Sequence, residues 1–177
     1  MVSKSTIVYL TAKHVLFLKV IQFSGSPQLP YHCYFCEMQL DQYELGIRHR
    51  EPILVEEEVE YLKRDYGIEG ISLLDEIGIP LNRKKAILYL EALGRTNIKW
   101  RAQCRVDNVT SELAKLAQDA GCVTMALGVE SASQQALDII NKKIEVDKAR
   151  ESIHNLKKSG IETRIYMICG LNSGVHV

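Results

Sequence analysis

The sequence predicts an α/β fold in which a parallel sheet curls into a partial TIM-like (β/α) barrel. From about residue 15 onward, short β-rich runs alternate with helical periods. No Pro/Ser-rich linker or internal repeat divides the 177 residues. Parallel strands joined by right-handed helical crossovers curl naturally toward a barrel, so we expect about five βα units in one domain.

The expected elements follow in chain order. A first strand is expected near residues 14–23 and a helix near 53–66, with a buried stripe of Val55, Val59, Leu62 and Tyr66. The later elements are a strand at 70–74, a helix after Asn82, a strand at 98–104, a helix after Thr110, a strand at 122–129, helices near 133–140 and 146–159, and a strand at 161–168. Asn82 and Thr110 suit the N-cap because their side-chain oxygens can accept first-turn N–H groups.

Alternation within the strands predicts which side chains face into the barrel. In "IKWRAQCR", residues 98–105, apolar residues alternate with polar ones, and in "CVTMALGV" Val123, Met125, Leu127 and Val129 should face the helices. Ligand sites of parallel α/β folds form where strands end, so inward-facing charges should converge there: Glu76, Arg105, Glu130 and Arg164. The alternative is that these are solvated charges on an open sheet.

Composition limits the function classes. The 22 basic and 22 acidic side chains give a net charge of +0, so no long-range field draws the protein to nucleic acid or an anionic membrane. Lys13 and Lys19 interrupt the apolar N-terminal residues, which predicts neither an export signal nor a membrane span. Five cysteines, an odd number, indicate a reducing, cytoplasmic location. There, a close pair such as Cys33 and Cys36 indicates metal or redox chemistry.

An ordered series of segments resembles the radical S-adenosylmethionine (SAM) superfamily. The segments are "PYHCYFC", "VEEEVEYLKRDYGIEGISLLDE", "WRAQCRVD", "LAKLAQDAGCVTMALGVESAS" and "NKKIEVDKARESIHNLKKSGIETRIYMICGL". They are most similar to the branch whose fuller members carry a cobalamin-binding domain ahead of the barrel. The resemblance implies a single core domain over 1–177, with a poorly matched segment at 1–18, about five of six βα units, the C-terminal part of the barrel missing and no cobalamin domain.

The resemblance also implies cofactors and site residues. In this family Cys thiolates hold a [4Fe-4S] cluster, and reductive cleavage of SAM gives a 5′-deoxyadenosyl radical that acts on a substrate. The implied partners are therefore a small-molecule substrate and an electron donor. By position, Cys33 and Cys36 resemble the second and third cluster ligands of the family. The implied SAM contacts are Phe35 at the adenine, Asp75 or Glu76 at the amino group, Arg105 and Arg164 at the carboxylate, and Glu130 with Ser131 near the ribose. Strand parity favours Glu76 over Asp75.

One departure from the family pattern bears on function. Leu29 stands where the family has its first cluster cysteine, and leucine has no lone pair to give to iron. His32 and His49 lie in the same loop, and imidazole replaces thiolate in some iron–sulfur centres. Cys169 ends the fifth expected strand near the barrel mouth and is the best substitute on geometry.

Several interpretations remain open from the sequence. The leading one is a radical SAM enzyme domain, and the alternative is a degenerate, non-catalytic fragment of such a barrel without a competent cluster. A thioredoxin-like redox pair should open a helix directly, whereas a charged loop follows here, and a zinc knuckle would need a second C-x2-C pair. Cys104 and Cys122 fall at apolar strand positions and are expected in the core. The fifth strand would have an unpaired edge, which is a route to self-association.

Overall fold

A five-stranded parallel sheet forms the centre of the computed structural model, which describes residues 15–18, 33–36, 50–75 and 77–170. The strand order is β1-β2-β3-β4-β5, and every neighbouring pair is parallel. The elements are β1 (Val15–Leu18), α1 (Pro52–Tyr66), β2 (Gly70–Leu73), α2 (Arg83–Thr96), β3 (Lys99–Arg105), a 3₁₀ turn (Val106–Asn108), α3 (Ser111–Asp119), β4 (Cys122–Glu130), α4 (Gln134–Ile139), α5 (Val146–Lys158) and β5 (Glu162–Met167).

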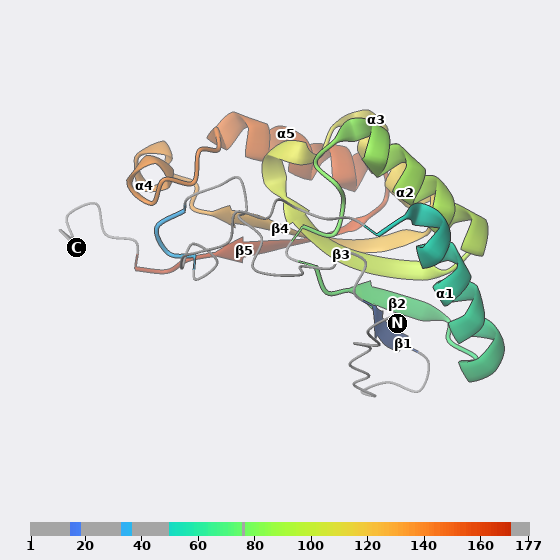
Figure 1. Cartoon of the computed structure of the whole chain (residues 1–177). Helices are drawn as coiled ribbons and strands as arrows, with labels where there is room; N and C mark the ends of the chain where they lie inside the picture. The colour runs from blue at the N-terminus through green and yellow to red at the C-terminus, as the bar shows by residue number, and fades with distance from the viewer. Residues whose placement is uncertain (1–14, 19–32, 37–49, 76, 171–177) are drawn as a thin grey trace.

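The larger helices, α1, α2, α3 and α5, lie together on one face of the sheet (Figure 1). Sequential parallel strands with helices on one side are the arrangement of an open part of a (β/α) barrel, which confirms the predicted fold class. The predicted first strand is present as Val15–Leu18, and the rest of its predicted range lies outside the described residues. No helix in the described part of the chain is long and apolar enough to cross a bilayer.

Two helices begin at the predicted caps. The Asn82 side chain accepts the Lys85 N–H at 3.1 Å, and the Thr110 hydroxyl accepts the Leu113 N–H at 3.2 Å. Gly121 follows α3 with φ +95, and a Cβ there would lie 2.3 Å from the Ile98 carbonyl oxygen. Only glycine therefore lets the chain turn from α3 into β4 so close to the strand beside it.

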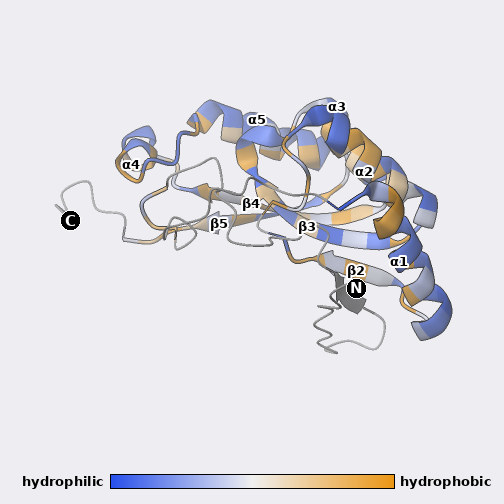
Figure 2. Ribbon diagram, in the orientation of Figure 1, coloured by the Kyte–Doolittle hydropathy of each residue, from blue (hydrophilic) through white to orange (hydrophobic). Residues whose placement is uncertain are grey.

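The core lies between the helices and one face of the sheet. The inward faces of the helices are apolar and their outer faces are polar (Figure 2). Val55, Val59 and Leu62 of α1 are buried there as predicted, but Tyr66 is 64% exposed. Tyr66 is the last residue of α1, next to the C-cap Gly67, and its ring packs edge-on against Tyr61, with centroids 5.9 Å apart.

The predicted alternation of β3 and β4 holds, with one correction. Trp100 and Met125 are buried against the helices, whereas Val123, predicted to join them, is 46% exposed. The register between the strands shifts at this point: Trp100 pairs with Cys122, and Arg101 pairs with Thr124. Val123 is the extra residue of a β-bulge, so its side chain is turned out of the core.

Candidate functional site

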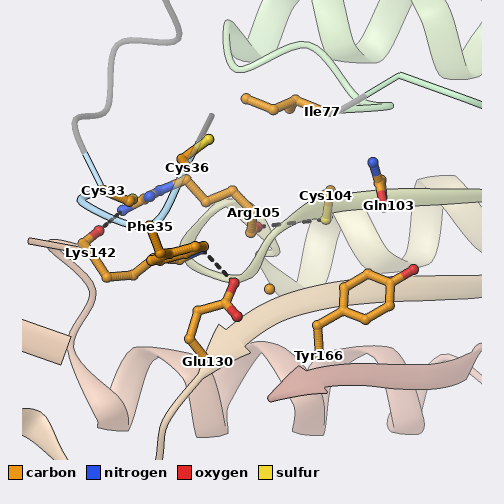
Figure 3. Close-up of a pocket in the computed structure, with 11 residues that line it drawn as sticks. Cys33, Phe35, Cys36, Ile77, Gln103, Cys104, Arg105, Glu130, Lys142 and Tyr166 are labelled. Atoms are coloured by element: carbon orange, nitrogen blue, oxygen red, sulfur yellow. Dashed lines mark hydrogen bonds and ion pairs between the residues drawn. The ribbon is translucent and has the colours of Figure 1, made fainter. Parts of the chain in front are cut away.

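A cavity of about 190 Å³ opens where β3 and β4 end (Figure 3). Five of the predicted site residues line it: Cys33, Phe35, Cys36, Arg105 and Glu130. The carboxyl ends of parallel strands share one edge of the sheet, so side chains that are distant in sequence meet there. The structure therefore brings the C-x2-C turn together with two of the four charges predicted to converge, Arg105 and Glu130.

The cysteine turn is docked on the end of α4. The Cys36 N–H donates to the Cys33 carbonyl at 3.0 Å, which closes the turn, and the Tyr34 N–H donates to the Ile140 carbonyl at 2.9 Å. Both thiols are free, with Cys33 buried and Cys36 half-buried. These two bonds fix the turn at the cavity through the backbone, with neither cysteine side chain involved.

Lys142 also lines the cavity, and the sequence analysis did not identify it. Its ammonium donates to Glu130 Oε1 at 2.9 Å and lies 5.5 Å from the centroid of the Phe35 ring. Figure 3 shows these three side chains grouped at one side of the cavity. The ammonium thus joins the carboxylate that ends β4 to the aromatic ring of the cysteine turn. Lys142 lies in the segment "NKKIEVD", in which no periodicity indicates that a lysine faces the cavity.

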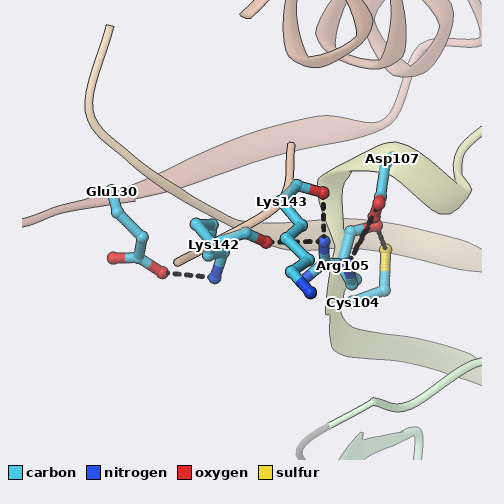
Figure 4. Close-up of polar contacts among 6 residues, drawn as sticks. All are labelled: Cys104, Arg105, Asp107, Glu130, Lys142 and Lys143. Carbon is cyan, nitrogen blue, oxygen red and sulfur yellow. Dashed lines mark hydrogen bonds and ion pairs between the residues drawn. The ribbon is translucent and has the colours of Figure 1, made fainter. Parts of the chain in front are cut away.

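Arg105 fixes the loop that carries Lys142 (Figure 4). Its Nη2 donates to the carbonyls of Lys142 at 2.8 Å and Lys143 at 2.9 Å, and its Nε donates to Asp107 at 3.0 Å. Asn141 and Lys143 both have positive φ, 53° and 51°, a conformation that costs energy for residues other than glycine. The buried guanidinium stabilises this conformation because it binds the two carbonyls that the loop turns inward.

Backbone geometry at the end of β4 aims Glu130 into the cavity. Gly128 pairs with Tyr166 and Glu130 with Met167, so the register shifts between them, and Glu130 has φ +67. The Ile168 N–H donates to the Glu130 carbonyl at 2.9 Å. A Cβ on Gly128 would lie 2.9 Å from Glu130 Oε1 and 3.1 Å from Lys142 Nζ. Glycine at 128 therefore makes the space that the ion pair occupies.

The other predicted residues lie elsewhere. Arg164 lines a second, adjoining cavity, and its Nε donates to Glu162 at 3.1 Å. The Ser131 hydroxyl accepts the Ser133 N–H at 3.1 Å, ahead of α4. The remaining named positions, Leu29, His32, His49 and Glu76, lie outside the described residues. The roles predicted for these four positions, and the SAM contacts predicted for Arg164 and Ser131, stay predictions.

The other three cysteines are separate from the C-x2-C turn. Cys104 and Cys122 are buried as predicted, and burial raises the pKa of both thiols, that of Cys122 to about 12. Cys169 is exposed, and the part of the chain that the structure describes contains no group of three His, Cys, Asp or Glu side chains that could hold a metal ion. Among the described residues Cys169 therefore forms no ligand group with the turn, and its substitution for a third ligand stays a prediction.

The cavity has the chemistry to hold a metal centre beside a charged organic ligand. Two thiols at C-x2-C spacing can bind a soft or borderline metal once ionised. Phe35 offers an aromatic face, and Lys142 and Glu130 offer opposite charges to an ionic ligand. The described residues supply two of the thiolates that a four-iron cluster needs.

Comparison with known sequences relates the chain to one family. The sequence pattern of the Radical SAM superfamily matches residues 26–174. The chain is 33% identical over 144 residues to the uncharacterized methyltransferase PH0819 of Pyrococcus horikoshii, covering 80% of this chain and 31% of that protein. It is 35% identical over 150 residues to the anaerobic magnesium-protoporphyrin IX monomethyl ester cyclase of Cereibacter sphaeroides, covering 81% and 24%. The chain thus spans less than a third of the length of these relatives.

Solved structures share the fold. The cobalamin-dependent SAM radical enzyme OxsB with aqua-cobalamin bound superposes with a TM-score of 0.73 at 19% identity, over 88% of this chain and 24% of that one. The radical SAM methyltransferase TsrM of Kitasatospora setae, with cobalamin and a [4Fe-4S] cluster bound, superposes with a TM-score of 0.67 at 18% identity, over 87% and 30%. At these identities the likeness extends to the fold alone.

Proposed function

Because this chain belongs to the radical SAM superfamily, we propose that it is the cofactor-binding core of an enzyme that generates a 5′-deoxyadenosyl radical. The cofactors of this family are the [4Fe-4S] cluster and SAM, as predicted from the sequence. When bound, they supply one-electron cleavage of the SAM sulfonium and hydrogen abstraction from a substrate. An electron donor and a small-molecule substrate are then the required partners.

One observation carries this proposal: the C-x2-C turn and the charged residues at the strand ends line the same cavity. In the proposed site Cys33 and Cys36 ligate iron, and Phe35 packs against the adenine. Glu130, held by Lys142 at 2.9 Å, presents a fixed carboxylate to the ribose. The two backbone hydrogen bonds of the cysteine turn position the thiols before any metal binds. Such positioning lowers the ordering cost of metal binding.

Lys142 and Arg105 act as positioning residues in this scheme. The Lys142 ammonium keeps the buried Glu130 carboxylate paired, and its cation–π contact orients the Phe35 ring. Arg105 lines the cavity, and its bonds to the carbonyls of Lys142 and Lys143 hold this loop in place. An Arg105 contact with the SAM carboxylate, as predicted from the sequence, would add to this role.

The second candidate function is a non-catalytic barrel of the same family. Leu29 stands at the position of the first cluster cysteine, and among described residues no third ligand joins Cys33 and Cys36. A two-thiolate site favours a labile or incomplete cluster, which could not support turnover. We keep the predicted reducing, cytosolic setting as part of both candidates, since an exposed cluster would be lost under oxidising conditions.

Anaerobic reconstitution with iron and sulfide separates the two candidates. We expect substoichiometric, oxygen-sensitive iron in the parent chain, and a higher iron content with detectable SAM cleavage in Leu29→Cys. Cys36→Ala in the Leu29→Cys background is the matched control and should return the iron content to the parent level or below. A full four-iron cluster in the parent, unchanged by Leu29→Cys, would overturn this account of Leu29.

A further inference from the structure

A second cavity of about 200 Å³ lies beside the first on the polar face of the sheet. Its wall includes Arg101 of β3, Thr124 of β4 and Arg164 of β5. Gln103 and Tyr166 belong to the walls of both cavities, so the two adjoin. Figure 3 shows Gln103 and Tyr166 at the side of the first cavity opposite Cys33.

Strand pairing arranges the inward side chains in three rows. Paired positions lie side by side across the sheet, and each row is two residues further along the strands than the one before. The rows are Ser72–Arg101–Thr124–Glu162, Gln103–Ala126–Arg164 and Arg105–Gly128–Tyr166. Residues from the first two rows line the second cavity and all of the third row lines the first. Arg164 pairs with Ala126, four residues before Glu130, which places it roughly 13 Å deeper along the strands.

Both arginines of the second cavity are held by neighbouring side chains. Arg101 Nε donates to the Ser72 hydroxyl at 2.9 Å, and Arg164 Nε donates to Glu162 Oε1 at 3.1 Å. The Thr124 hydroxyl donates to the other Glu162 oxygen at 3.2 Å, which fixes that carboxylate in turn. β3 and β5 flank β4, and Arg164 stands one row further along than Arg101, so the two arginine backbones are about 12 Å apart. The small side chain of Ala126 leaves the space between them open.

We propose that the second cavity binds a carboxylate group of the substrate, an inference that rests on the proposed radical SAM function. Guanidinium groups match the planar geometry of a carboxylate. The described residues that line the cavity include two arginines and no acidic side chain, and Glu162, outside this lining, contacts Arg164 through its Nε. Leu73, Leu74 and Ala102 complete an apolar part of the wall. The cavity therefore suits an anion joined to an apolar body.

The shared wall gives this subsite a role in orientation. A substrate held by Arg101 and Arg164 would extend past Gln103 and Tyr166 into the first cavity. Its far end would then lie beside Phe35 and Glu130, where the proposed radical is generated. Fixing one end of a substrate in this way selects which carbon meets the reactive group.

The test compares two probes that differ only in charge. The parent chain is titrated with 4-phenylbutyrate and with the neutral 4-phenylbutyramide, and binding is followed by calorimetry and ligand-observed NMR. We expect the carboxylate to bind about tenfold more tightly than the amide. Arg164→Gln and Arg101→Gln should each reduce that preference to about twofold or less. Arg150→Gln, which changes an exposed arginine of α5, is the matched control and should keep the preference.

Circular dichroism of each variant establishes that it is folded. Equal binding of the two probes to the parent would overturn the proposal, and so would a loss of the carboxylate preference in Arg150→Gln as large as in the two cavity variants.

S-adenosylhomocysteine is titrated in parallel to separate the two cavities. Probe discrimination without S-adenosylhomocysteine binding would leave the anion site standing and count against the proposed function. The opposite result would count against the anion site alone.

Discussion

The Lys142 ammonium and the Glu130 carboxylate form an ion pair at 2.9 Å, with only 11% and 10% of their side chains exposed. Lys142 lies in a loop fixed by Arg105, and Glu130 lies at a register shift of β4. A pair buried to this extent has lost most of its hydration, so each charge depends on the other. This relationship links the cysteine turn, the β4 end and the α4–α5 loop into one unit.

Breaking this ion pair should destabilise the fold. Lys142→Met leaves the Glu130 carboxylate buried without its cation, and we expect the free energy of unfolding to fall by about 3–5 kcal/mol. Urea denaturation measures the loss, and Lys142→Met with Glu130→Gln should recover part of it. Lys148→Met removes a lysine from the exposed pair with Glu151, 59% and 58% exposed, and should cost less than about 0.5 kcal/mol. Equal losses in the two single variants would contradict a special role for the buried pair.

Gly128→Ala should impair the site more than the fold. The added methyl would lie 2.9 Å from Glu130 Oε1 and 3.1 Å from Lys142 Nζ, so the ion pair must shift. We expect at least about tenfold weaker S-adenosylhomocysteine binding by calorimetry, with a loss of stability of about 1–2 kcal/mol. Gly94→Ala in α2 is the control, because its added methyl meets Ala120 at an ordinary 3.5 Å. Gly94→Ala should be neutral or slightly stabilising, and unchanged binding in Gly128→Ala would show that the ion pair does not shape the cavity.

The sequence predicted the scaffold well because its signals are local and periodic. Asn82 and Thr110 cap their helices through side chains three residues from the bonded N–H, and strand parity needs only two-residue alternation. The alternation predicted the wrong face for Val123 because a β-bulge is set by pairing with the neighbouring strand, which the alternation does not record. The burial predicted for Tyr66 was wrong because Tyr66 is the last residue of α1, next to the left-handed C-cap Gly67, and a helical period does not show where the packed part of a helix ends.

Site residues were predicted only where the sequence marks them by a motif spacing or by their position in a strand. Cys33, Cys36 and Phe35 stand in a recognisable spacing, and Glu130 ends a strand. Lys142 lies in a loop, and its place in the cavity depends on Arg105 binding two carbonyls and on two positive φ angles. No periodicity records such a conformation, so only the structure could show it. The same holds for the separate cavity that contains Arg164.

Iron content should depend on the C-x2-C turn and not on Cys169. After anaerobic reconstitution, we expect Cys33→Ala with Cys36→Ala to retain almost no iron, because both thiols at the cavity are lost. Cys169→Ala should keep the parent iron content, since Cys169 is exposed and forms no ligand group with the turn among described residues. Iron and sulfide analysis with the visible absorption spectrum measures both. A loss of iron in Cys169→Ala would show that this thiol reaches the metal when iron is present.

The buried thiols should make the fold sensitive to alkaline pH. Burial raises the pKa of Cys122 to about 12 from an ordinary 9.0, and burial also raises that of Cys104. Above pH 9 the unfolded chain loses these protons while the folded chain keeps them, so their contribution to stability is complete below pH 9 and is lost as the pH rises toward 12.

Each thiol should lower the free energy of unfolding by about 1.4 kcal/mol per pH unit above 9. Urea denaturation at pH 8, 9.5 and 10.5 should show a shallower decline in Cys122→Ala and in Cys104→Ala than in the parent. Cys169→Ala is the control and should follow the parent, because Cys169 is exposed and does not belong to the buried core. Parallel curves for all four proteins would mean that the buried thiols ionise in the folded state without cost. In that case they would lie in a more polar environment than the sheet–helix core provides.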